Sequence, residues 1–250
     1  MSEVEDDWVA EDFRLTPDAR NRDDERARAL DDDRRLTLRA WRRRDATPAE
    51  AARGDAIWRC GRELANVVYD VRPRGRVLEI GAGCSGFPGR AAARRPGVVK
   101  VTMLDCEPSA VLALRRALDH DRRHNADVVE AREITAEVFD VRNACKTREI
   151  EPKACYDTIL AADVLYDEEA PAALAALLRA SVAPGGVAIL TDNTDRPYES
   201  RRRDELRELL GGSFAPHGGD GAGGRRTTVE FKCRQGGVFD IEELVLRRVG

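Results

Sequence analysis

The sequence predicts an α/β fold with a seven-stranded, mostly parallel sheet, helices on both of its faces and an antiparallel hairpin at the carboxyl end. Three observations predict it. Between residues 76 and 210, short runs of β-branched and aliphatic residues alternate with helical patterns, as in βαβ units. A glycine-rich turn follows the first run, at residues 81–86. The last two strand-like runs are joined without a helix and must therefore be antiparallel.

The predicted elements follow one another in a regular order along the chain. Pro108 suits the first turn of a helix, because its missing N–H costs nothing there. Gly236-Gly237 connects the two final strands, whereas residues 211–224 are glycine-rich and are expected to form a flexible loop. The expected strands are 76–80, 99–104, 128–131, 157–161, 187–191, 227–232 and 239–245, and the expected helices are 90–94, one that begins at 107–109, 168–182 and 197–210.

The first 53 residues differ in character from the rest. Charged runs such as Asp31-Asp32-Asp33 and Arg42-Arg43-Arg44 occur there with few apolar residues between them. Mixed charge of this density is typical of a solvated helix or a disordered segment. We therefore expect residues 1–53 to form a charged arm, helical or disordered, and residues 54–250 to form one folded domain.

The composition argues against several classes of protein. Forty-two basic and 46 acidic residues give a net charge of −4, which provides no overall attraction for nucleic acid or an anionic membrane. Six cysteines without a C-x-x-C pair indicate neither a zinc site nor a disulfide framework. No apolar run approaches the ~18 residues of a membrane span. We expect a monomeric cytoplasmic protein without a metal, with the nucleus as the alternative location.

The turn at residues 81–86 has the form G-x-G-x-x-G, which lets the backbone approach a ligand closely. Asp105, at the end of the next strand, is placed to accept hydrogen bonds from ribose hydroxyls. Both features fit a dinucleotide and S-adenosylmethionine alike. Glu79 would repel a pyrophosphate and favour a ligand that carries an ammonium and a sulfonium, so it favours S-adenosylmethionine. The terminal hairpin favours the same choice, because a dinucleotide fold extends its sheet with parallel strands.

These motifs resemble those of the seven-β-strand, or class I, S-adenosylmethionine-dependent methyltransferases, and within them the protein-lysine methyltransferase group with a D-x-x-Y motif after strand four. The resemblance covers roughly residues 55 to 250 and implies a Rossmann-like fold. The matching segments are Ile57-Trp58 with the run through residues 64–68, Val77-Leu78-Glu79-Ile80-Gly81-Ala82-Gly83, Leu104-Asp105, Ala161-Ala162-Asp163-Val164-Leu165-Tyr166 and Pro184-Gly185-Gly186.

The resemblance also implies where S-adenosylmethionine and the acceptor bind. Asp105 would hold the ribose, and Asp163 and Tyr166 would lie at the mouth through which the acceptor nitrogen enters. The group often has an aromatic residue near the adenine after strand three, whereas residues 133–136 of this chain include none. The remaining contacts with the cofactor are expected from Trp58, Glu79, Gly81, Ala82, Gly83, Thr135 and Ala162.

The expected function is a methyltransferase that modifies a lysine side chain of a protein substrate. Asp163 would orient the acceptor ammonium, and Tyr166 would shape the channel so that the nitrogen lone pair points at the methyl group. Three alternatives stay open at this point. The acceptor could be a small molecule or RNA, of which RNA is disfavoured by the net charge. The glycine turn could instead serve an NAD(P)-dependent oxidoreductase, or the chain could be a non-catalytic binding module that recognises a partner with its charged arm.

Overall fold

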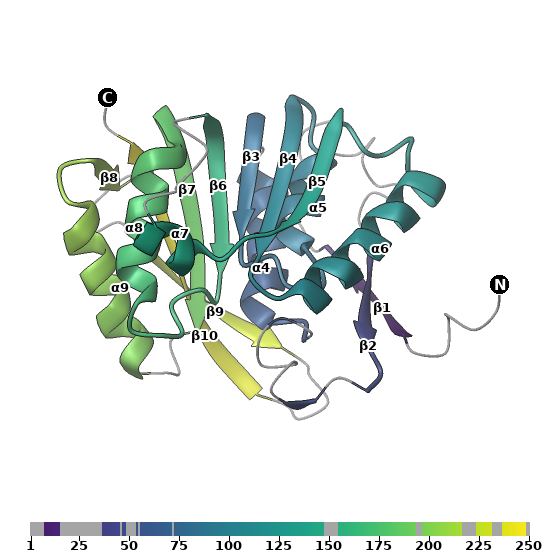
Figure 1. Cartoon of the computed structure of the whole chain (residues 1–250), viewed down its shortest axis with the longest axis horizontal. Coiled ribbons are helices and arrows are strands. Elements are labelled where there is room, and N and C mark those ends of the chain that lie inside the picture. Colours follow the sequence, from purple (N-terminus) through teal and green to yellow (C-terminus); the bar gives the residue numbers. More distant parts are fainter. Residues whose placement is uncertain are drawn as a thin grey trace.

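The computed structural model describes residues 8–15, 37–45, 47–48, 54, 56–71, 73–147, 155–193, 197–216, 224–231 and 237–248. Its main part has three layers, a central sheet with helices on both faces, and a separate pair of strands lies beside them (Figure 1). In chain order the elements are β1 (Trp8–Arg14), β2 (Thr37–Arg43), α4 (Arg59–Val71), β3 (Gly75–Ile80), α5 (Phe87–Ala93), β4 (Val98–Asp105), α6 (Pro108–His124), β5 (Glu133–Val138), α7 (Val141–Thr147), β6 (Tyr156–Ala162), α8 (Ala170–Ser181), β7 (Val182–Asn193), α9 (Pro197–Leu210), β8 (Phe214–Pro216), β9 (Gly224–Phe231) and β10 (Gly237–Arg248).

The central sheet has eight strands in the described part of the chain. Their order along the sheet is β5-β4-β3-β6-β7-β10-β8, and β9 also pairs with β10. Strands β3 to β7 are parallel to one another, whereas β10 is antiparallel to β7, β8 and β9. The α/β class, the mostly parallel sheet and the terminal hairpin are therefore confirmed. The expected count of seven strands was wrong, because Phe214–Pro216, inside the expected glycine-rich loop, pairs with β10 as a short extra strand.

The third strand of the predicted series lies further along the chain than expected. The sequence predicts it at residues 128–131, but Val128 is buried outside the sheet and β5 begins at Glu133. β5 is an edge strand that pairs only with β4 among the described residues, and Ala136 is its one buried residue. A strand with so little burial does not need a strongly apolar sequence. The prediction therefore favoured the more apolar run that precedes it.

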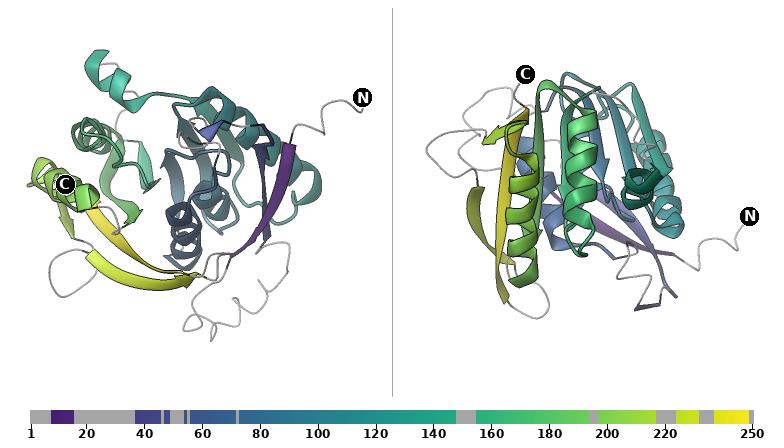
Figure 2. Two further views of the ribbon diagram at one scale, coloured as in Figure 1. Left: turned by 90° about the horizontal axis from the view of Figure 1, so that it is seen from below. Right: turned by 60° about the vertical axis from the view of Figure 1, so that its left-hand side comes forward.

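Side chains alternate between the two faces of the sheet, and each face packs against its own helices. Val77 and Val101 belong to a hydrophobic cluster with residues of α4, α5 and α6. Leu78 and Ile159 belong to a second cluster with residues of α8 and α9, which cover the opposite face (Figure 2). This arrangement follows from the two-residue period of a strand and buries both faces of the sheet. None of the described helices is long and apolar enough to span a membrane.

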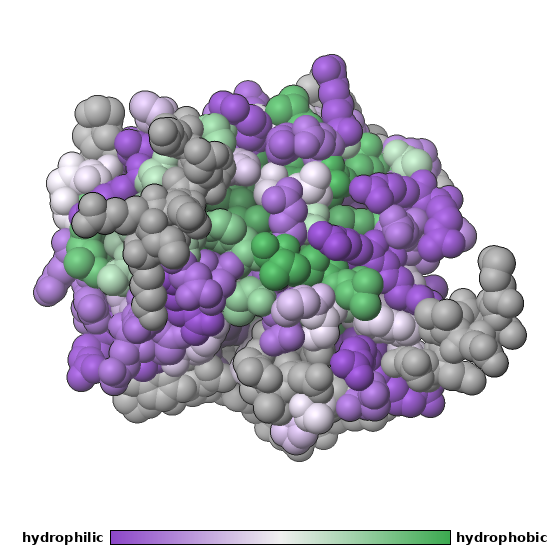
Figure 3. Space-filling model, in the orientation of Figure 1, coloured by the Kyte–Doolittle hydropathy of each residue, from purple (hydrophilic) through white to green (hydrophobic). Residues whose placement is uncertain are grey.

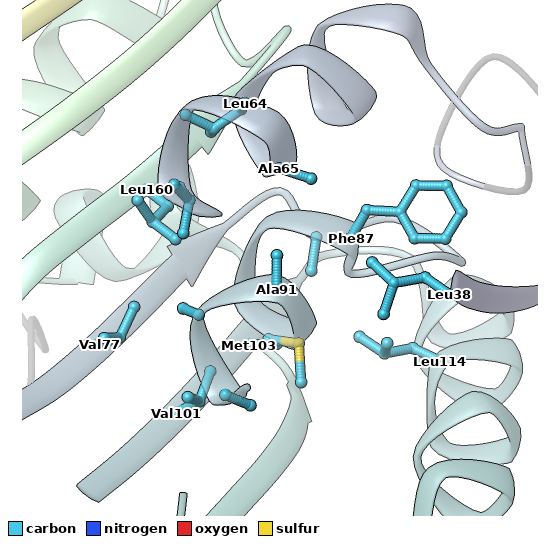
Figure 4. Close-up of a cluster of buried hydrophobic side chains, with 14 of the residues drawn as sticks. Leu38, Leu64, Ala65, Val77, Phe87, Ala91, Val101, Met103, Leu114 and Leu160 are labelled. Atoms are coloured by element: carbon cyan, nitrogen blue, oxygen red, sulfur yellow. The ribbon is translucent and has the colours of Figure 1, made fainter. Parts of the chain in front are cut away.

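Within the described part of the N-terminal arm, residues 8–14 and 37–43 form two antiparallel strands, β1 and β2, where a helix or disordered segment was expected, and most of the remaining arm lies outside the described residues. Leu38 and Ala40 of β2 are 0% exposed and belong to the same core cluster as α5 and α6. Leu38 lies near Phe87 and Leu114 of those helices (Figure 4). Leu38 and Ala40 stand at alternate positions of β2, so part of one face of the strand is buried although the arm is highly charged. The prediction missed this period of two.

A buried ion-pair cluster ties β2 to the glycine turn. Arg90 Nε and Arg94 Nη2 donate to the two carboxylate oxygens of Asp121 at 2.8 and 3.0 Å. Arg90 also donates to the carbonyl of Ser85 in the turn, and Arg94 to the carbonyl of Thr37 in β2. Burial opposes the ionisation of Asp121, but the two guanidinium groups outweigh it and lower the pKa of Asp121 to about 2. The arm is therefore anchored to the helices that support the turn.

Candidate active site

A cavity opens at the carboxyl ends of β3, β4 and β6. From β3 the chain extends the sheet through β4 and β5 on one side, and it then returns to build β6 and β7 on the other. Ligands of open α/β sheets bind at such a switch point, outside the carboxyl ends of the strands. The residues that line the cavity are Gly54, Trp58, Ile80, Gly81, Gly83, Leu104, Asp105, Cys106, Phe139, Asp140, Val141, Arg142, Ala162, Asp163, Val164, Tyr166, Asp167, Ala170, Ala173 and Leu174.

The lining combines apolar walls with a few charged groups. Hydrophobic side chains gather near the middle of the face shown in Figure 3, among hydrophilic ones. Among the described residues, the charged ones that line the cavity are four aspartates and Arg142. Apolar walls with a small number of polar groups are typical of a site for a small molecule.

The glycine turn approaches the cavity in a backbone conformation that other residues rarely adopt. The φ angles of Gly81, Gly83 and Gly86 are 67°, 58° and 52°. A Cβ atom on Gly81 would lie 2.7 Å from Val164 Cγ1, and one on Gly86 would lie 2.6 Å from Leu114 Cδ1. The turn itself therefore requires the glycines of the G-x-G-x-x-G motif. Two of them, Gly81 and Gly83, line the cavity.

Gly54 is a cavity residue that the sequence interpretation missed. Its carbonyl accepts the N–H of Cys84 at 2.8 Å, and a Cβ on Gly83 would lie 3.3 Å from the same oxygen. Its own φ of 137° is a value that side chains with L configuration rarely adopt. A single glycine at the end of a charged segment carries no recognisable signal, so its role follows only from the contact with the turn.

Asp105 is held at the cavity by backbone groups. Its Oδ2 accepts the N–H of Gly83 at 2.7 Å, and its Oδ1 accepts the N–H of Glu107 at 2.9 Å. The residue is 6% exposed. A carboxylate oxygen can accept more than one hydrogen bond, so these backbone contacts are compatible with hydrogen bonds from the hydroxyl groups of a ligand. The carboxylate is thus both fixed in place and able to bind.

Glu79 lies beneath the turn and does not line the cavity as described. Its Oε2 accepts the N–H of Gly89 in α5 at 2.8 Å, and a Cβ on Gly89 would lie 2.5 Å from the same oxygen. Burial raises the pKa of Glu79 to about 8, with Asp105 adding to the rise and the Gly89 N–H and Arg90 opposing it. Glu79 is therefore largely neutral at pH 7, and the charge that the sequence argument gave it does not distinguish between cofactors.

We expect Glu79→Gln to change how the stability of the protein depends on pH. The pKa of Glu79 is about 8 in the folded protein against an ordinary value of 4.5, so between these pH values the folded protein keeps a proton that the unfolded chain has released. The free energy of unfolding therefore falls as the pH rises through this window, by about 5 kcal/mol more in the parent than in the variant. Urea unfolding at a series of pH values measures both profiles, and parallel profiles would contradict the assignment.

The structure brings most of the expected site residues together at the cavity. Two others do not line it: Ala82 is buried with its N–H bound to the carbonyl of Leu104, and Thr135 lies within β5 opposite Thr102 of β4. Neither is among the described residues that line the cavity. The expected residues that do line it are Trp58, Gly81, Gly83, Asp105, Ala162, Asp163 and Tyr166.

An aromatic side chain lies at the cavity, directly after β5 and not within it. Phe139 lines the cavity, and its N–H donates to the carbonyl of Asp105 at 2.8 Å. The sequence interpretation looked for this group at residues 133–136 because it ended the third strand too early. Placing the end of the strand at Val138 would have pointed to Phe139 as the residue that follows it.

The segment after β6 contributes a carboxylate and a phenol to the same cavity. Asp163 is the one non-glycine residue of the described part with φ in the left-handed region, at 52°, and its N–H donates to the carbonyl of Thr191 in β7 at 2.9 Å. Such a conformation is uncommon outside glycine and often marks a functional site. Tyr166 is 49% exposed. Burial of its hydroxyl raises the pKa of Tyr166 to about 12, so the phenol stays protonated at neutral pH.

Solved structures with the same fold include several methyltransferases. A candidate RNA methyltransferase from Pyrococcus horikoshii is 14% identical, with a TM-score of 0.54, over 82% of this chain and 91% of that one. The [4+2]-cyclase SpnF is 16% identical, with a TM-score of 0.53, over 75% of this chain and 81% of that one. A 16S rRNA guanosine methyltransferase from T. thermophilus, solved with S-adenosylmethionine and guanosine, is 16% identical, with a TM-score of 0.50, over 85% of this chain and 43% of that one.

At these identities the structural likeness shows the fold, and the family comes from the sequence. No curated protein matches the chain. A family model described as lysine methyltransferase matches residues 56–205, which include the glycine turn, Asp105 and the segment after β6. The chain therefore belongs to the lysine methyltransferase family and is an S-adenosylmethionine-dependent methyltransferase.

Proposed function

We propose that this protein transfers the methyl group of S-adenosylmethionine to a lysine side chain of a protein substrate. The observation that carries the proposal is that Asp163 and Tyr166 share one cavity with Asp105 and the glycine turn. The carboxylate that would bind the acceptor ammonium and the one that would bind the ribose therefore line the same cavity. The match of residues 56–205 to the lysine methyltransferase family model supports the same acceptor.

The residues of the cavity fit S-adenosylmethionine, which supplies a methyl group on a sulfonium sulfur. Gly81 has no Cβ and would leave room for the methionine part against its backbone. The fixed carboxylate of Asp105 would accept hydrogen bonds from the two ribose hydroxyls. Phe139 and Leu104 provide apolar surface for the adenine ring. Donor and apolar groups of the ligand therefore have complementary partners along the cavity.

The acceptor amine must lose a proton before it can attack. A free lysine has a pKa of about 10.4. Partial burial in the cavity would lower the pKa of the acceptor amine, while the neighbouring carboxylate of Asp163 would oppose that fall, and the proton would leave to water at the open mouth. Asp163 would then orient the nitrogen, and the neutral phenol of Tyr166 would close one side of the channel. The C–N bond forms as the S–C bond breaks, and the electron pair of the S–C bond remains on sulfur. Positioning in line with that bond provides most of the catalysis.

Charge around the segment after β6 also supports a lysine acceptor. Glu168 and Glu169 are exposed directly before α8, and Asp167 lines the cavity. Arg142, the one cationic residue of the described lining, is paired with Asp140 and Asp167. An acidic mouth attracts a cationic side chain and repels the phosphates of RNA.

Transfer of labelled methyl groups from S-adenosylmethionine into a fractionated cell lysate tests the proposal. We expect label in the protein fraction, released as methylated lysine after acid hydrolysis. A preparation of the Asp163→Asn variant serves as the control for contaminating methyltransferases. Label that enters only RNA or only small molecules, with none in protein, would contradict the proposed acceptor while leaving the methyltransferase assignment in place.

A further inference from the structure

One guanidinium group at the cavity connects loops from three strands. Arg142, in the first turn of α7, lines the cavity with a side chain that is 33% exposed. Its Nε pairs with Asp140 Oδ1 at 3.2 Å, and its Nη1 pairs with Asp167 Oδ2 at 2.7 Å. Its Nη2 lies 4.0 Å from Cys106 Sγ. These three partners follow β5, β6 and β4, so Arg142 spans the strand ends around the cavity.

On one side Arg142 contacts the residues that would surround the adenosine. Asp140 follows Phe139, and Cys106 follows Asp105. Asp140 Oδ1 also accepts the backbone N–H of Arg142 at 2.9 Å, which fixes the start of α7. A ligand that packs against this loop would therefore restrict the side chain of Arg142 as well as its backbone.

On the other side Arg142 contacts the acceptor segment, which we define as residues 163–167. Asp167 Oδ1 accepts the N–H groups of Glu169 and Ala170 at 3.0 and 2.9 Å and so begins α8. Its other oxygen, Oδ2, takes the bond from Arg142. Both oxygens of Asp167 thus accept hydrogen bonds, one from the N–H groups at the start of α8 and the other from Arg142.

Two further anchors of the acceptor segment come from behind it, while the side chain of Tyr166 also bonds to that of Cys106 at the cavity. The N–H of Asp163 bonds to the carbonyl of Thr191 in β7, and Arg202 Nη1 in α9 donates to the carbonyl of Leu165 at 3.1 Å. Neither Thr191 nor Arg202 is among the described residues that line the cavity. A bound cofactor would not touch these two anchors, whereas it would lie directly beside Arg142.

We propose that Arg142 is a positioning residue that couples binding of the cofactor to ordering of the acceptor segment. When the adenosine restricts the loop after β5, Arg142 holds Asp167 and with it the neighbouring Tyr166 in the geometry that transfer needs. The two carboxylates that neutralise Arg142 also keep its charge from opposing a cationic cofactor. The inference rests on the proposed function for the role of the acceptor segment, but its test needs no acceptor.

Amide hydrogen exchange with and without S-adenosylhomocysteine tests the coupling. In the parent we expect the ligand to slow exchange of residues 164–170 by about tenfold. In Arg142→Met and in Asp167→Asn, which keeps the Oδ1 acceptor for α8, we expect that slowing to fall below about twofold. Arg142→Lys, which keeps the charge but lacks the planar fork, should retain part of it. Arg207→Met breaks the exposed pair with Asp204 on α9 and is the matched control, with the full effect of the ligand.

Two further readouts separate coupling from a general loosening of the loop. Calorimetry should give S-adenosylhomocysteine affinities within about threefold of the parent for all variants. In the double variant Arg142→Met with Asp167→Asn, the slowing of exchange by the ligand should match that in the single variants. Loosening alone would speed exchange equally in both states and leave the slowing by ligand intact, which would overturn the proposal. A large loss of affinity in Arg142→Met would also overturn it, because Arg142 would then be a direct cofactor contact.

Discussion

Replacing Asp105 with asparagine is expected to weaken the binding of S-adenosylhomocysteine by about 100-fold or more. In the parent, both carboxylate oxygens are held by backbone N–H groups, which orient the carboxylate toward the cavity without excluding hydrogen bonds from a ligand. An amide presents an NH₂ group to one of these N–H donors and carries no charge. The variant therefore loses charge-assisted hydrogen bonds to the ribose, which are the strong kind. Isothermal titration calorimetry of parent and variant measures the loss.

Glu107→Gln is the matched control for this change. It removes the same charge two residues away, while the backbone N–H that Glu107 donates to Asp105 is kept. Glu107 is not among the described residues that line the cavity, and its carboxylate accepts a bond from Ser109. We expect its affinity for S-adenosylhomocysteine to match that of the parent. An Asp105→Asn protein that unfolds at the parental temperature and binds with parental affinity would show that the ribose lies elsewhere.

The second large effect is expected for Asp163→Asn, which should lower kcat for methyl transfer by about 100-fold or more and change the affinity for S-adenosylhomocysteine by less than about threefold. The negative charge that orients the acceptor ammonium is lost, whereas the cofactor contacts are retained. Asparagine is the appropriate replacement because it tolerates the left-handed conformation at φ 52°, in which alanine would be strained. Transfer assays with label and calorimetry on the same preparations measure the two quantities.

Glu205, an exposed residue of α9, is not among the described residues that line the cavity, so Glu205→Gln controls for the loss of one negative charge outside the lining. Its activity should equal that of the parent. Parental kcat in Asp163→Asn would remove this residue from the mechanism. A parallel loss of cofactor affinity would instead assign Asp163 to the cofactor and leave the acceptor without a recognised partner.

The main features of the fold could be predicted because they rest on local patterns. A buried parallel strand followed by G-x-G-x-x-G and a helix is distinctive in sequence, and the structure shows that the glycines at 81 and 86 are required by contacts with Val164 and Leu114. The antiparallel hairpin followed from a connection too short for a crossover. In both cases the geometry of the backbone leaves few alternatives.

Other features depended on contacts that are distant in the sequence. β5 has little burial, so its position is set by pairing with β4 and not by its own composition, and Phe139 was missed with it. Leu38 and Ala40 are buried only because β2 packs against helices more than 40 residues further along the chain. The neutral state of Glu79 follows from its burial under α5, which the sequence alone does not give.

A crystal structure of the protein with S-adenosylhomocysteine would show whether one cavity at the carboxyl ends of β3, β4 and β6 holds the cofactor and admits the acceptor. We expect the ribose hydroxyls on Asp105, the adenine against Phe139, and the sulfur between the glycine turn and Asp163. A ligand bound outside this cavity, or bound within it with its sulfur turned away from Asp163, would contradict both binding proposals.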